Sequence, residues 1–125
     1  MTATSRLFWT LLLAVLGLGA AALALVPSPP QTLDTGWDKL NHVLAFAALA
    51  FCARLAAEGS RWPALRWQAL VLAWGVLIEL AQTQVPGRHG EWPDVVADAV
   101  GMGLGLGAGW LALRWARFKG RREMA

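Results

Sequence analysis

The feature that most constrains this chain is a run of 20 residues without a charged side chain, from Leu7 to Val26. An α-helix rises about 1.5 Å per residue, so this run is long enough to cross a hydrocarbon layer of about 30 Å. Only 15% of all residues are charged, whereas an ordinary soluble domain carries about 25%. These observations exclude an ordinary soluble domain and a disordered tail, and they predict a membrane protein.

Three further apolar segments predict three further membrane spans. Prolines and glycines border these segments, and such residues mark the ends and first turns of helices. A barrel is not expected, because the chain lacks a series of alternating strands of about 10 residues. We predict one all-α domain over residues 1–125, an integral membrane four-helix bundle. Its expected spans cover about residues 7–26, 40–57, 63–85 and 93–115.

The first apolar run also has some features of a secretory signal peptide. Arg6 precedes the run, and Ala22-Leu23-Ala24 resembles a cleavage site. The run is longer than the 7–15 apolar residues of a usual signal peptide, so its retention as a span is favoured. Cleavage is the alternative, and it would leave the orientation of the other three spans unchanged.

Lysine and arginine are unequally divided between the two sides of the predicted spans. Nine of the 11 lie on the side that holds both chain ends, and only Lys39 and Arg88 lie on the other side. The positive-inside rule therefore predicts cytoplasmic termini, with residues 117–125 as a basic cytoplasmic tail. This tail is expected to contact membrane lipid rather than nucleic acid, because its only aromatic side chain is Phe118.

Ionisable side chains lie inside three of the predicted spans, toward the outer side. His42, Glu79 and Asp98 each lie about 18–24 Å along the helix axis from an arginine at the inner end of the same span. A charged group at this depth costs about 3 kcal/mol unless it is paired or hydrated, so we expect these side chains to meet. We predict an outward-facing polar pocket between the second, third and fourth spans. Its expected members are Asp38, Lys39, His42, Glu79, Gln82, Arg88, Asp94 and Asp98.

These residue types indicate roles within the predicted pocket. His42, Glu79 and Asp98 are candidate acid–base residues, because an imidazole beside carboxyl groups can accept and return a proton. The other five are candidate substrate-binding residues, and among them Lys39 and Arg88 can bind a phosphate or carboxylate group. Arg88 is also the expected counter-charge of the buried carboxylates. The five are Asp38, Lys39, Gln82, Arg88 and Asp94.

Several other kinds of site are not expected. No nucleophile motif is present, and Cys52 lies within a span without a recognisable base beside it in sequence. We predict no metal and no cofactor, because histidine pairs and cysteine pairs with metal-ligand spacing are absent and the basic side chains would repel a cation. His89 and Glu91 are interpreted as solvated loop residues.

Small residues recur at every fourth position of the fourth span. Gly101, Gly105 and Gly109 would share one helix face, and small residues at this spacing allow two helix backbones to approach closely. Packing within the bundle is the favoured interpretation. An oligomer formed through the Gly101/Gly105/Gly109 face is the alternative.

Four motifs of the predicted pocket follow one another along the chain. They are Asp38-Lys39-x-x-His42, Glu79-x-x-Gln82, Pro86-Gly87-Arg88 and Asp94-x-x-x-Asp98-x-x-Gly101. Together, over about residues 35–107, they resemble the VanZ-like family of bacterial membrane proteins. That family is associated with low-level resistance to the glycopeptide teicoplanin, and it commonly has asparagine where this chain has Asp98.

The resemblance implies a multi-pass protein of the bacterial cytoplasmic membrane. It also implies binding of, or action on, a cell-envelope component such as a lipid-linked or peptidoglycan-related molecule, with an effect on teicoplanin sensitivity. The resemblance does not supply a reaction. Two alternatives remain on the residues alone: a small transporter or proton-linked carrier, and a non-enzymatic membrane scaffold.

Overall fold

The computed structural model describes residues 2–27, 37–86 and 91–122. These residues form four helices and no strand: α1 (Ala3–Leu25), α2 (Asp38–Ala56), α3 (Ala64–Gln82) and α4 (Trp92–Arg122). Each helix is long and apolar enough to cross a membrane. The predicted all-α fold with four candidate spans is therefore confirmed.

The fourth helix is longer than the sequence predicts. It has 31 residues and is therefore about 46 Å long, which exceeds the thickness of a hydrocarbon layer. Arginine and lysine are good helix formers, so the basic segment continues α4 as far as Arg122 instead of ending it near Trp115. α3 ends earlier than expected, at Gln82, because the residue before Pro86 disfavours helical geometry.

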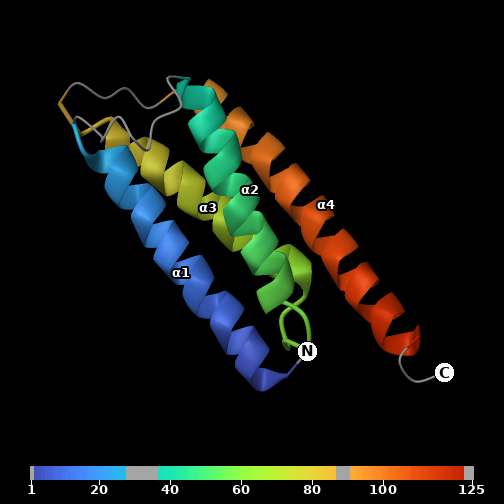
Figure 1. The fold of residues 1–125 in the computed structure, drawn as a ribbon. Helices are drawn as coiled ribbons and strands as arrows, with labels where there is room; N and C mark the ends of the chain where they lie inside the picture. The colour runs from blue at the N-terminus through green and yellow to red at the C-terminus, as the bar shows by residue number, and fades with distance from the viewer. Residues whose placement is uncertain (1, 28–36, 87–90, 123–125) are drawn as a thin grey trace.

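α2 lies at the centre of the bundle. It contacts each of the other three helices, and its contact with α4 is the most extensive between any two helices. Figure 1 shows α2 between α1 and α4, with α3 behind it. Phe46, Leu49 and Ala53 of α2 pack with Val71 of α3 as the hydrophobic core.

α1 lies at the edge of the bundle and has no buried residue. Side-chain donors attach it to its neighbours at three heights. Trp74 Nε1 donates to the Gly17 carbonyl at 3.0 Å, and Gln82 Nε2 donates to the Ala24 carbonyl at 3.1 Å. Near the other end of α1, Arg6 donates to the Gly59 carbonyl, which follows α2. Hydrogen bonds of this kind can stabilise helix association in an apolar layer.

The glycine face of α4 packs directly on the backbone of α2. A Cβ atom on Gly101 would overlap the Val43 carbonyl, and one on Gly105 would overlap the Ala47 carbonyl. Gly109 lies against the side chain of Arg54, where a Cβ atom would be 2.9 Å from the Arg54 Cβ and Cγ atoms. The glycine face is therefore occupied by α2 of the same chain. This agrees with the prediction that the face packs within the bundle.

We expect Gly105→Ala to lower the free energy of unfolding by about 1–3 kcal/mol, because the new methyl group would have to displace the backbone of α2. Reversible denaturation in detergent micelles measures this difference. Gly107→Ala is the matched control, since nothing lies within 4 Å of a Cβ atom at Gly107. Equal stability of the two variants would contradict the proposed close contact.

Candidate functional site

His42 is the central side chain of a polar cluster that joins α2, α3 and α4. Its Nδ1 atom lies 2.8 Å from Asp98 Oδ1 of α4, which is a hydrogen-bond distance. Its Nε2 atom lies 3.8 Å from Glu79 Oε1 of α3 and 4.0 Å from Asp38 Oδ2, one turn earlier in α2. The structure thus brings together the three ionisable side chains that the sequence places at a common depth.

Two glycine contacts determine how closely His42 and Asp98 approach. Gly101 packs on the carbonyl of Val43, the residue next to His42, and lies one turn beyond Asp98 in α4. On the other side, a Cβ atom at Gly75 of α3 would overlap Asp98 Oδ2. The absence of side chains at these glycines leaves the space in which Asp98 is completely buried.

Two carboxylate oxygens in the cluster have no hydrogen-bond partner among the described residues. One is Asp98 Oδ2, and the other is Glu79 Oε1, the oxygen that lies 3.8 Å from His42 Nε2. The second oxygen of Glu79 accepts a hydrogen bond of 3.1 Å from the backbone N–H of Glu91. An unpaired buried polar atom is costly, so these two oxygens are available to a proton or to a donor group of a ligand.

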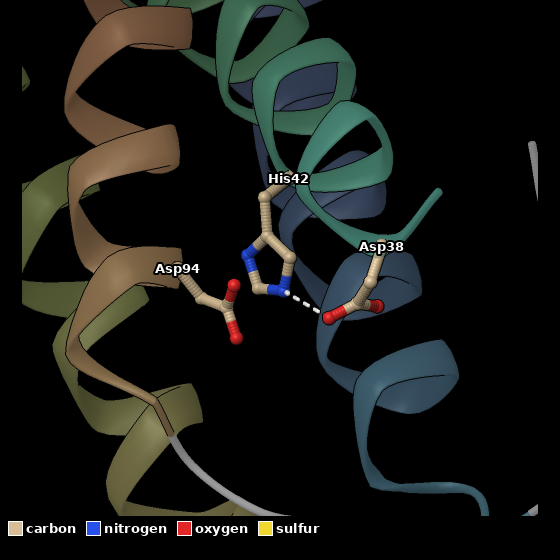
Figure 2. A group of neighbouring side chains, drawn as sticks. All are labelled: Asp38, His42 and Asp94. Atoms are coloured by element: carbon tan, nitrogen blue, oxygen red, sulfur yellow. Dashed lines mark ion pairs between the residues drawn. The ribbon is translucent and has the colours of Figure 1, made fainter. Parts of the chain in front are cut away.

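Lys39 and the start of α4 form the edge of the cluster. Lys39 Nζ lies 3.3 Å from Asp94 Oδ1 and 3.6 Å from Glu91 Oε2. Asp94 is only 2% exposed and lies in the first turn of α4, where the helix dipole stabilises a negative charge. The side chains of Asp38 and Lys39 remain 60% and 41% exposed, so the cluster is reached from this edge. Figure 2 shows the His42 ring between Asp38 and Asp94.

The sequence prediction and the structure do not agree at every residue of the cluster. Gln82 does not join the cluster, because its side chain donates to the Ala24 carbonyl of α1. Glu91, interpreted from sequence as a solvated loop residue, contributes both its backbone N–H and its carboxylate. Its position immediately before Trp92-Pro93 was the available signal, since the first N–H groups of a helix lack partners within it. Arg88, the expected counter-charge, lies outside the described residues.

The cluster also contains residue types that bind metal ions. Two sets place a histidine nitrogen and two carboxylate oxygens within 4.8 Å of one another: Asp38, His42 and Asp94, and His42, Glu79 and Asp98. However, Nδ1 of His42 is engaged by Asp98, and Lys39 already pairs with Asp94. This geometry therefore favours an acid–base site over a metal-binding site.

The arrangement is suited to proton transfer. A carboxylate that binds one imidazole nitrogen fixes the orientation of the ring and its tautomer. Asp98 binds Nδ1 in this way, and Nε2 faces Glu79 and the exposed edge beside Asp38. His42 can therefore exchange a proton at Nε2 while Asp98 holds its position.

No protein-family model, curated protein or solved structure matches this chain.

We expect the neutral ring of His42 to carry its proton on Nδ1, because a carboxylate at 2.8 Å accepts it. Asp98→Leu should move that proton to Nε2. The measurement is ¹⁵N NMR of histidine-labelled protein in micelles. The sequence holds two histidines, so His89→Gln in both samples leaves a single signal to assign.

An unprotonated Nδ1 in the protein with Asp98 intact would contradict this assignment. In that case Asp98 would carry the proton and donate it to the ring. An unchanged tautomer in Asp98→Leu would show that the hydrogen bond across α2 and α4 does not orient His42.

Proposed function

We propose that this protein is a VanZ-like membrane protein that binds or acts on a cell-envelope component through the His42 cluster. The cluster meets the surroundings at Asp38 and Lys39, where a ligand would enter. Lys39, together with Arg88, would bind a phosphate or carboxylate group, as found on lipid-linked and peptidoglycan-related molecules. His42 would then exchange a proton with the bound molecule at Nε2.

The buried hydrogen bond between His42 and Asp98 is the observation that carries this proposal. A charged group within the hydrocarbon layer costs about 3 kcal/mol, whereas hydrogen bonds between membrane helices return only about 0.6 kcal/mol on average. The side chain of His42 is 11% exposed and that of Asp98 is fully buried. Uncharged side chains would hold the helices together at a lower cost than ionisable ones. The cluster is therefore better explained by a role in catalysis or ligand binding than by a role in stability alone.

The proposal includes an orientation and a location. Both termini would be cytoplasmic and the cluster would lie near the outer surface of a bacterial cytoplasmic membrane, because most lysines and arginines flank the opposite ends of the helices. Figure 1 supports a common side for the two termini, since the start of α1 and the end of α4 lie toward the same end of the bundle. An outward-facing cluster would have direct access to envelope components.

A proton-linked carrier is the second candidate function. The observation that favours it is the series Glu79, His42 and Asp98, in which two carboxylate oxygens remain unpaired among the described residues. The cluster lies within the first turns of α2 and α4 and the last turn of α3, so it is confined to one end of the bundle. A carrier would need a route from this cluster to the opposite end.

The first experiment measures teicoplanin sensitivity in a susceptible bacterium that produces the protein. We expect the intact protein to raise the inhibitory concentration, and His42→Gln or Glu79→Gln to return it to the value of cells with an empty vector. Gln84→Ala is the control, because Gln84 is an exposed residue near the same end, outside the cluster. Immunoblots of membranes check that all variants accumulate equally.

Full resistance in both cluster variants would contradict the acid–base role. An intact protein that leaves the inhibitory concentration unchanged would contradict the effect on teicoplanin. Acidification of liposomes that contain purified protein, abolished by Glu79→Gln, would instead favour the proton-linked carrier.

The second experiment tests orientation with alkaline phosphatase, which is active only outside the cytoplasmic membrane. We expect an inactive enzyme when it is fused after Ala125 and an active enzyme when it is fused after Pro86, which follows α3. A fluorescent protein that matures only in the cytoplasm should give the opposite result at each position. Active phosphatase after Ala125 would contradict the proposed orientation.

A further inference from the structure

A second polar region lies at the opposite end of the bundle, between the end of α2 and the last turns of α4. Here the two helices border a groove with a volume of about 370 Å³. We call it the arginine groove. Its lining residues are Arg54, Trp110, Leu113, Arg114, Arg117, Phe118 and Arg121.

The arginine groove has more positive charge than the described residues around it neutralise. Glu58 receives hydrogen bonds from Arg54, at 3.1 Å, and from Arg117. Burial alone would raise the pKa of Glu58, but these two hydrogen bonds outweigh burial and hold the pKa below its ordinary value. Glu58 therefore stays charged at neutral pH and fixes both arginines, although a single carboxylate balances only one of them.

The other two arginines of the groove have no carboxylate partner among the described residues. Arg114 lies over the ring of Trp110, with 5.2 Å between its Cζ atom and the ring centroid. This contact orients the guanidinium group without neutralising it. Arg121 lines the groove about two turns further along α4. Both are available to an anion, and a guanidinium group can donate two parallel hydrogen bonds to phosphate oxygens.

The remainder of the groove is apolar. Leu113 is buried, whereas Trp110 and Phe118 are each 50% exposed. Trp110 and Leu113 lie beside the last turn of α2, since the neighbouring Gly109 contacts Arg54, and Phe118 lies further along α4. The helices around them are long and apolar enough to span a membrane. A ligand that matches both parts has an anionic head and an apolar chain. A free anion would contact the arginines and leave the apolar side chains uncovered.

We propose that the arginine groove binds the phosphate headgroup of an anionic phospholipid. Arg114 and Arg121 contact the phosphate. Arg54 and Arg117, held in place by Glu58, add positive charge nearby. Trp110 and Leu113 contact the first part of an acyl chain. Basic pockets between membrane helices on the cytoplasmic side bind such headgroups in other proteins. This site shares no residue with the His42 cluster, so it does not depend on the proposed function.

The test uses the full-length protein in membranes of phosphatidylcholine that contain a small fraction of spin-labelled phosphatidylglycerol. Electron paramagnetic resonance measures the share of labelled lipid held by the protein. We expect a preference for phosphatidylglycerol over labelled phosphatidylcholine. Arg114→Gln and Arg121→Gln should each lower that preference about fivefold, as expected for the loss of one arginine near anionic lipid.

The matched control removes the same charge at the same end but outside the groove. Arg61→Gln and Arg66→Gln are suitable, because both residues are exposed and lie between α2 and α3 or at the start of α3. Equal losses in groove and control variants would overturn the proposal in favour of a diffuse charge effect. Displacement of the lipid by inorganic phosphate at a similar concentration would also overturn it, by assigning the groove to a free anion. Size-exclusion chromatography confirms that each variant is folded.

Discussion

The contact of α4 with the backbone of α2 is the constraint on which the rest of the structure depends. Gly101 and Gly105 lie against the carbonyls of Val43 and Ala47, so the two helices approach as closely as their main chains permit. Only at this separation does His42 reach the fully buried carboxylate of Asp98. Membrane helices use packing of this kind because the hydrophobic effect does not drive them together in lipid, and small residues allow the close van der Waals contact that does.

The two ends of the bundle have opposite electrostatic character. One end gathers carboxylates around His42 and Lys39. Among the described residues, the other end places four arginines along one groove, and Glu58 binds two of them, Arg54 and Arg117. The acidic end is largely enclosed, whereas the basic end lies along a helix that extends beyond its neighbours. The four helices thus carry one centre suited to proton exchange and one groove suited to binding an anionic group.

Much of the fold follows from the sequence, because charge-free runs of sufficient length predict spans directly. The meeting of His42, Glu79 and Asp98 follows from their common depth and the cost of isolation. The partner of each polar atom does not follow. Gln82 shares a helix face with Glu79, yet it donates to α1, whose position on that side is decided by tertiary packing. Glu91 binds Glu79 through its backbone N–H, a group that every residue but proline has, so residue type gave no indication of this contact.

The main-chain contact between α2 and α4 also limits how this protein can diversify. Side-chain exchange cannot narrow the spacing between those two helices, and any side chain larger than hydrogen at Gly101 or Gly105 of α4 forces them apart. α3 is different, because it meets α2 through the larger side chains of Phe46 and Val71. Replacement of residues along α3 other than Gly75, which lies against Asp98, would change the position of Glu79 more readily than the distance between His42 and Asp98. Divergence in the geometry of the cluster would accordingly arise from α3 and from the exposed side chains of Asp38 and Lys39, while the contact between α2 and α4 stays fixed.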